Sequence, residues 1–295
     1  MKGYRTTSWP AALLMVVCLA GSMLSLRSVD KIRGQQSTLE DVLYVHSGKT
    51  LKRLSLGYSG LLADIYWTRA VQYFGTKHGE HSTRYDLLYP LLDITTDLDP
   101  HLTIAYQFGS IFLSQPAPSG AGQPEKAVEL VEKGIRANPD QWRLYFTLGY
   151  IHYFDRKDYK AAQLAFQKGS EVPGALPWMR VMAAAMAQHA GESATATEIW
   201  RRLYESTDDE GIRQNAMQHL VALQVDTEIT ELQWRIDLYR EKMNRAPAGW
   251  QELIQAGLLK HIPRDPGNAP YVLTANGTVQ VQDPKQLPFI TKGLP

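Results

Sequence analysis

The chain has 295 residues, of which 44% are hydrophobic, so it can bury a substantial core in one elongated array or in two compact domains. Its formal net charge is +1, from 31 basic and 30 acidic residues, which excludes the strongly basic surface typical of nucleic-acid-binding domains. The single cysteine, Cys18, excludes a disulfide framework, a thiolate metal cluster and a paired-thiol redox motif.

The N-terminal segment, residues 1–33, carries a membrane signal. Lys2 and Arg5 precede a run without charged residues from Trp9 to Leu26. This run is close to the lower limit of about 20 residues for a spanning helix, and it also fits the apolar core of a signal peptide. Because the run continues past the small residues at 19–22, we favour an uncleaved anchor over a cleaved signal or a wholly soluble chain. We expect a single-pass protein of the inner (cytoplasmic) membrane with its soluble part in the periplasm.

Residues 34–60 read as a linker or a helical lead-in to the first hairpin. Apolar residues then recur at helical spacing over 61–74, and Gly75 is the expected stop of this helix. A second helix is expected over about 85–98, where Pro90 restricts the position of the first turn. The two segments predict an antiparallel helix pair.

The stretch from Trp142 to Pro173 predicts two helices on either side of the polar break at 155–158. It resembles one unit of the tetratricopeptide repeat family, in which an aromatic-x-x-Leu-Gly helix packs on an Ala-x-x-x-Phe helix that ends at a proline. The matching residues are Tyr145, Leu148, Gly149, Ala162, Phe166 and Pro173. The resemblance implies that these side chains pack the two helices together. The segment 56–75 also resembles part of bacterial membrane-anchored tetratricopeptide proteins of undefined role.

Further units follow the same spacing. Pro100, Pro139 and Pro173 are 39 and 34 residues apart, against a family period of about 34. We interpret the longer interval as a Pro- and Gly-rich insertion at 114–124 that loops out of the stack. The second helices of these units are marked by small and aromatic residues, to which we assign packing roles: Ala127, Gly134, Ala196 and Trp200.

The predicted array therefore spans 61–225 and contains about four hairpins. One or two more helices, over about 209–224 and 227–243, are expected to cap it. Each unit alone cannot bury its apolar face, so the units must stack, and the first helices line an inner groove. This groove is the default functional surface of a repeat array.

In the central unit, Arg143, Phe146, Tyr150 and Tyr153 recur at helical spacing on a face distinct from that of the packing residues. We predict that these four side chains form a protein-binding groove. The alternative is that they pack on the neighbouring hairpin. Well-known chaperone-binding members of the family clamp a carboxylate with Lys and Asn on this face. Since Phe146 and Tyr150 occupy those places here, we do not expect that mode of binding.

The last segment, residues 226–295, combines a capping helix with a small α+β tail. We expect a short helix over 249–256 and two strands, 271–273 and 278–281, joined by Asn276-Gly277, in which both residues tolerate positive φ. The tail resembles the C-terminal part of type II secretion pseudopilins and related type IV pilin-like proteins. The matching residues are Tyr239, Asn244 to Pro247, Leu253, Gly257 to Leu259, Ile262 to Pro266, Pro270 and Tyr271.

This resemblance has a limit, because residues 267–269 lack the tryptophan of the family's usual Asp-Pro-Trp-Gly-Asn-Pro-Tyr. It implies that the tail docks on a pilin-like or secretion assembly. The alternative is a small cap over the last repeat helix.

Metal and acid–base chemistry have few candidates. His78 and His81 lie three residues apart in a predicted polar loop without a third ligand at a useful spacing. Asp265 beside Asn268 holds a turn or, as in calcium-binding pseudopilins, an ion. His152 occupies an aromatic position of the central repeat, and we expect it to be packed in the array. Three carboxylates, Asp93, Asp97 and Asp99, are expected to solvate a helix face or hold a turn.

We therefore predict a mostly α protein: a tetratricopeptide-like solenoid of helical hairpins with an N-terminal transmembrane helix and a small C-terminal α+β tail. We expect a non-enzymatic scaffold without catalytic residues, bound metal, cofactor or small-molecule substrate. Its partners would be other proteins of the membrane or envelope, in the assembly of a secretion or pilus-like complex. One alternative is a permanent structural subunit of a larger membrane complex, and another is a metal protein or enzyme centred on His78 and His81.

Overall fold

The computed structural model describes residues 15, 18–19, 21–23 and 47–294. The predicted anchor, residues 1–33, falls outside the described residues except at those six positions. Among the helices that the structure describes, none has both the length and the apolar run needed to cross a bilayer.

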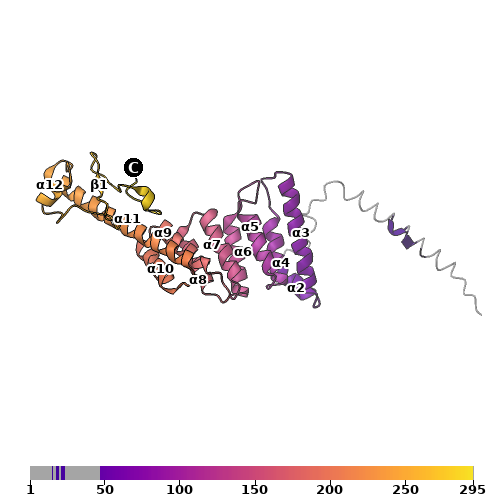
Figure 1. Cartoon of the computed structure of the whole chain (residues 1–295). Coiled ribbons are helices and arrows are strands. Elements are labelled where there is room, and N and C mark those ends of the chain that lie inside the picture. Colours follow the sequence, from indigo (N-terminus) through magenta and orange to yellow (C-terminus); the bar gives the residue numbers. More distant parts are fainter. Residues whose placement is uncertain (1–14, 16–17, 20, 24–46, 295) are drawn as a thin grey trace, which may run out of the picture.

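The described chain is a succession of α-helices that ends in a small two-stranded tail (Figure 1). The helices are α2 (Gly48–Leu54), α3 (Ser59–Gly79), α4 (Leu88–Leu98), α5 (Thr103–Ser114), α6 (Pro124–Ala137), α7 (Trp142–Phe154), α8 (Tyr159–Ser170), α9 (Trp178–His189), α10 (Ser193–Ser206), α11 (Glu210–Met243) and α12 (Trp250–Gln255). Helices consecutive in the chain pack antiparallel against each other, as expected for a repeat array. The mostly α fold with a small C-terminal tail is thus confirmed.

Small residues allow the paired helices to approach closely. A Cβ atom placed on Gly149 of α7 would lie 2.7 Å from the Phe166 ring of α8, and one on Gly134 of α6 would lie 2.7 Å from the Tyr106 ring of α5. Ordinary carbon contacts are about 3.5–4.0 Å, so only glycine fits these two crossings without a shift of the neighbouring ring. The close packing buries Phe166 and Tyr106 completely.

The amphipathic pattern of α6 shows how the sequence sets the helix orientation. Pro124 begins the helix, where its fixed φ is suitable and the missing N–H has no intrahelical partner to lose. Ala127, Leu130, Val131 and Gly134 are buried at spacings of three and four residues, which places them on one face. That face packs on α5 and α7, and the charged residues of α6 other than Lys133 are exposed.

The insertion between α5 and α6 is a loop, as expected, but it is tied to the array rather than projecting freely from it. The amide of Ala121 donates to the carbonyl of Phe112 at 2.9 Å, and Ala121 is buried against the core. The hydroxyl of Tyr85, which lies between α3 and α4, donates to the Pro118 carbonyl at 2.9 Å. These bonds satisfy backbone groups that a loop covering apolar side chains would otherwise leave unpaired.

One predicted helix boundary is wrong. Helix α3 runs through Gly75 to Gly79, because Gly75 lies on an open face where an added Cβ would meet no atom within 4 Å, so the glycine is tolerated there. Of the one or two capping helices expected over 209–224 and 227–243, the structure has a single helix of 34 residues, α11. Asp226, in the expected break, is buried, and its carboxylate accepts bonds from the backbone amides of Thr291 and Lys292, both at 2.9 Å.

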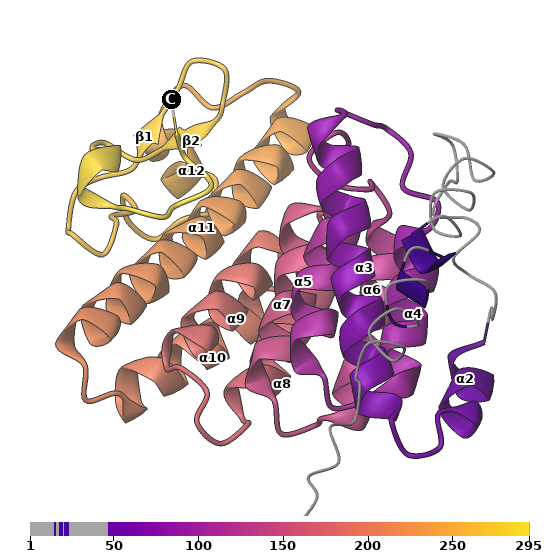
Figure 2. The same cartoon turned by 90° about the vertical axis from the view of Figure 1, so that its right-hand side faces the viewer.

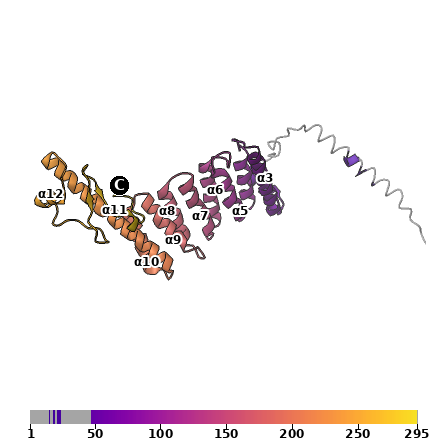
Figure 3. The ribbon, with the colours of Figure 1, turned by 45° about the horizontal axis from the view of Figure 1, so that its top comes forward.

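The tail folds on the second half of α11 (Figures 2 and 3). Strands β1 (Val272–Leu273) and β2 (Val279–Gln280) pair antiparallel, with Val272 opposite Gln280. The strands are joined through Asn276-Gly277 as expected, and in this turn Gly277 has a positive φ, +76°, whereas Asn276 does not. The tail core is apolar and includes Ile236, Tyr239, Leu253, Tyr271 and Val279.

Candidate protein-binding surface

Helix α7 holds the four predicted groove residues. Its buried face carries Leu144 and Ile151, both fully buried, seven residues apart and therefore on the same side of the helix. An adjacent face carries Arg143 and Phe154, which are exposed, and Tyr150, which is half-buried. Helix α7 therefore packs against the array on one face and is accessible to solvent on another.

Aromatic rings follow one another along the open side of α7. The Phe146 and Tyr150 centroids are 6.3 Å apart, and those of Tyr150 and Phe154 are 4.5 Å apart in a stacked pair. Tyr153 meets Phe154 edge to face at 4.5 Å. We call Phe146, Tyr150, Tyr153 and Phe154 the α7 aromatic strip. Because each ring contacts the next, the strip is ordered before any partner binds.

The strip has a packed edge and an open edge. Phe146 contacts Phe166 of α8 at 6.0 Å and meets Trp178 of α9 edge to face at 5.2 Å. Tyr153 lies 6.1 Å from Tyr159 of α8. Phe146 and Tyr153 therefore border the core between α7 and α9, whereas Phe154 keeps 47% of its surface exposed.

Cations lie at both ends of the strip rather than within it. The Arg143 guanidinium sits 4.5 Å above the Trp142 ring, so this predicted groove residue is directed to Trp142. The Lys157 ammonium lies 5.8 Å from the Phe154 ring at the other end. Cation–π contacts of this kind contribute about 0.5–1 kcal/mol when exposed, and they leave the charges available to acidic groups of a partner.

Sequence reasoning missed two members of this surface. Phe154 lies four residues after Tyr150, so helical spacing was a sufficient signal for it. Trp178 begins α9, beyond the loop that follows α8, and no spacing within one helix could place it against Phe146. Helix α5, which packs on α7, also leaves Ile104 and Phe108 exposed.

The predicted packing residues lie between the helices. Tyr145 and Leu148 are half-buried. The other predicted packing residues are buried: Gly149, Ala162, Phe166, Ala127, Gly134, Ala196 and Trp200. A Cβ atom placed on Gly169 would lie 2.7 Å from the Tyr145 side chain, which is a second close approach of α7 and α8. Trp200 stacks on His219 of α11 at 4.1 Å. These side chains support the binding face without forming part of it.

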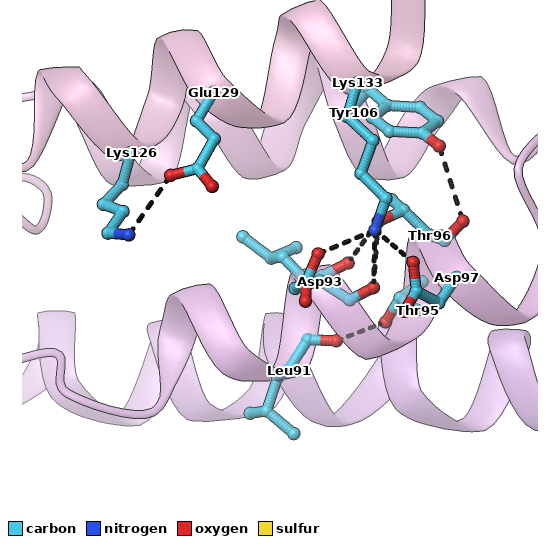
Figure 4. Close-up of polar contacts among 10 residues, drawn as sticks. Leu91, Asp93, Thr95, Thr96, Asp97, Tyr106, Lys126, Glu129 and Lys133 are labelled. Carbon is cyan, nitrogen blue, oxygen red and sulfur yellow. Dashed lines mark hydrogen bonds and ion pairs between the residues drawn. The ribbon is translucent and has the colours of Figure 1, made fainter. Parts of the chain in front are cut away.

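The predicted acidic face near the start of the array is an ion cluster rather than a solvated surface (Figure 4). The Lys133 ammonium of α6 lies 2.7 Å from the Asp93 carboxylate and 2.6 Å from the Asp97 carboxylate, both on α4. It also donates to the Asp93 carbonyl at 3.1 Å. Asp99 instead accepts from the His101 amide at 2.9 Å and holds a turn. The cluster braces α4 against α6.

The histidine and turn candidates are built into the fold. His78 lies in the last turn of α3 and stacks on Phe74 at 5.7 Å, so it is not in a loop as predicted. Asp265 accepts from the Ala269 amide at 2.9 Å and thus holds a turn. His152 is buried in α7, and burial, followed by the nearby Arg156 charge, lowers its pKa. Across the described part of the chain, no group of three or more His, Cys, Asp or Glu side chains is placed to hold a metal ion.

The fold and this surface define an α-helical protein built by consecutive antiparallel helix packing. No protein-family model matches the chain, and a comparison with curated proteins finds no match. What the protein does is therefore inferred from its own residues.

Proposed function

We propose that this protein is a membrane-anchored scaffold of the tetratricopeptide type that binds a partner protein along the α7 aromatic strip. The consecutive helix pairs and the glycine crossings at Gly134 and Gly149 support the repeat-array part of the proposal. The uncharged run from Trp9 to Leu26 supports an anchor in the inner membrane, with the array in the periplasm.

The observation that carries the proposal is a continuous set of contacting rings with one exposed edge. Aromatic side chains dominate the binding energy of many protein interfaces, and rings that are already ordered lose little entropy on binding. Tyr150 and Phe154 offer apolar surface, and Tyr150 adds a hydroxyl that can pair with a partner's backbone. An apolar helix or extended segment with acidic residues near its ends fits a strip flanked by Arg143 and Lys157.

The C-terminal tail supports a role in assembly of a secretion or pilus-like complex. It has an apolar core of its own, mainly on the second half of α11, and it also contacts the array where Phe289 stacks on His219. The segment that resembles pilin-like proteins is fixed by Arg245, whose two nitrogens bond the Glu252 carboxylate at 2.7 and 3.2 Å. We infer that this module docks on a pilin-like or secretion component while the array holds a second protein.

A second function, a permanent subunit of a larger membrane complex, is favoured by apolar side chains far from the strip. Trp234 and Met217 on α11 are both exposed, as is Tyr204 on α10. In a permanent complex, neighbouring subunits would cover these side chains. The two functions differ in stoichiometry, which is variable for a scaffold and its clients and fixed for a subunit.

The test is a mild-detergent pull-down of the full-length protein from native membranes, followed by mass spectrometry. The test variant is the double substitution Tyr150→Ser/Phe154→Ser, and the matched control is Leu164→Ser, an exposed apolar residue of the neighbouring helix α8. We expect the double variant to lose specific partners that the control retains. Equal recovery of all partners by both variants would contradict binding at the strip, and recovery in a fixed ratio would favour the permanent subunit.

A further inference from the structure

The corner where α2 meets α3 exposes apolar and basic side chains together. We define the α2–α3 corner as the exposed residues Lys49, Lys52, Arg53, Leu54, Leu56, Tyr58 and Leu61. They lie within 13 consecutive positions, at the end of the array opposite the tail (Figure 1). No acidic residue occurs between Gly48 and Ala63, so three positive charges stand beside four large apolar side chains.

The backbone holds this corner in one orientation. Gly48 approaches α4 so closely that an added Cβ would lie 2.5 Å from the Asp97 Cβ atom. Leu51 packs against the core between α3 and α7. With Gly48 and Leu51 directed at the array, Lys49, Lys52 and Arg53 are left exposed. The charged side chains are therefore presented outward by a helix that is fixed to the array.

Leu56 is the least expected member of the corner. Its φ is +50°, in the left-handed region, which costs an L residue roughly 1–2 kcal/mol. Its side chain is 88% exposed, so packing against the described residues does not offset this cost. Glycine would be more stable at this position, as it is at the next one, Gly57, where φ is +94°. A strained and exposed leucine is explained if its side chain is used by something outside the described chain.

The chemistry of the corner matches the surface of an anionic bilayer. Leucine side chains insert at the boundary between headgroups and acyl chains, tyrosine favours the headgroup level, and each cation near an anionic leaflet contributes about 1 kcal/mol. A soluble protein partner would also accept the leucines, but clustered lysine and arginine, with no acidic residue between Gly48 and Ala63, favour an anionic surface.

Chain connectivity favours the same occupant. The predicted membrane run ends at Leu26, and only 21 residues separate it from Gly48, the first residue of α2. Twenty or so residues span at most about 70 Å when fully extended and much less on average. Of the folded part of the chain, the α2–α3 corner is therefore the nearest in sequence to the predicted anchor.

We propose that the α2–α3 corner binds the surface of a bilayer that contains anionic lipid and thereby holds the array in a fixed orientation relative to the membrane. This site is separate from the α7 aromatic strip, and the proposal does not depend on what the strip binds. The leucines enter the headgroup region, and Lys49, Lys52 and Arg53 pair with lipid phosphates.

The test uses the full-length protein with Cys18→Ser, which removes the single native thiol, and Leu56→Cys labelled with an environment-sensitive fluorophore. It is reconstituted in vesicles of phosphatidylcholine alone or mixed with phosphatidylglycerol, with and without doxyl-labelled lipid as a quencher. The matched control carries the label at Leu164→Cys, an exposed leucine in the middle of the array on α8. A second variant adds Lys49→Glu, Lys52→Glu and Arg53→Glu.

We expect the label at position 56 to shift to shorter wavelength and to be quenched by doxyl lipid in the anionic vesicles, with no change at position 164. The triple charge reversal should reduce the quenching several-fold. Emission at position 56 that matches a water-exposed label in both kinds of vesicle would overturn the proposal. A short-wavelength emission already present in detergent and insensitive to doxyl lipid would also overturn it, because it would mean that protein covers the corner, either residues N-terminal to α2 or a second copy of the chain.

Discussion

Gly149 and the Phe166 ring meet at the crossing of α7 and α8 with no room for a side chain between them. We expect Gly149→Ala to destabilise the protein by about 1–3 kcal/mol, because the methyl group must displace a fully buried ring from a tight core. The measurement is the urea midpoint of unfolding of the full-length protein in mild detergent, with circular dichroism as the signal.

The matched control is Gly75→Ala. Gly75 lies inside α3, and a Cβ there meets no atom within 4 Å. Alanine should therefore stabilise the helix by about 0.5–1 kcal/mol. Equal effects at the two glycines would show that the crossing at Gly149 is not tight.

The strip residues should separate into two groups by stability. Phe146→Ser removes contacts with Phe166 and Trp178 and is expected to cost about 1–3 kcal/mol, less than the 3–5 kcal/mol typical of a fully buried phenylalanine because Phe146 is only half-buried. Phe154→Ser should change stability by no more than about 0.5 kcal/mol, since its ring is largely exposed. Thermal midpoints of the two variants compare them directly. A large loss for Phe154→Ser would make the whole strip core and remove the basis for a binding face.

Lys133 is predicted to matter far more than an exposed lysine on the same helix. Lys133→Met would leave the Asp93 and Asp97 carboxylates facing each other without a counter-ion, and we expect a loss of about 1–2 kcal/mol. Lys126→Met, which breaks an exposed pair with Glu129, should cost less than about 0.5 kcal/mol. Denaturant titrations at low and high salt check this. If added salt lowers the free energy of unfolding of the wild type and of the Lys133 variant by the same amount, the ion cluster is not the source of their difference in stability.

Local spacing was enough to predict the repeat-like part of the fold. Tyr145, Gly149, Ala162 and Phe166 are close in sequence, and the rules that relate them act within one hairpin. Interactions between distant segments were not accessible in this way. The Asp226 carboxylate of α11 binds amides 65 and 66 residues further along, in a segment that no local rule connects to this helix.

The candidate surface shows the same division. Tyr150 and Phe154 follow from helical periodicity, whereas the contact of Phe146 with Trp178 depends on how α7 and α9 cross. The ion cluster also required the fold, because 40 residues separate Lys133 from Asp93. Composition showed that basic and acidic residues nearly balance. It could not show that Lys49, Lys52 and Arg53 share an exposed corner with leucines.

The attachment of the tail to the array is expected to depend on pH through one histidine. His219 of α11 is stacked between Trp200, at 4.1 Å, and Phe289 of the tail, at 4.0 Å. Its Nδ1 atom lies 2.8 Å from the Gln188 amide oxygen, and the Gln188 amide nitrogen donates to the Phe289 carbonyl at 3.2 Å. Because an amide oxygen only accepts, Nδ1 carries the hydrogen of this bond.

Burial, with a smaller contribution from the nearby His189, lowers the pKa of His219 from its usual 6.5 to about 4. The folded state thus favours the neutral ring, so its contribution to stability is fully present above pH 6.5 and is lost as the pH falls toward 4. We expect His219→Phe, which keeps an apolar ring in the stack, to be less sensitive to acid than the wild type by about 2–3 kcal/mol across this window. Thermal midpoints measured from pH 7 to pH 4 for both proteins give the comparison, with His261→Phe, an exposed histidine of the tail, as the control. Parallel pH profiles for the wild type and His219→Phe would mean that the two aromatic faces stabilise the imidazolium as much as burial opposes it.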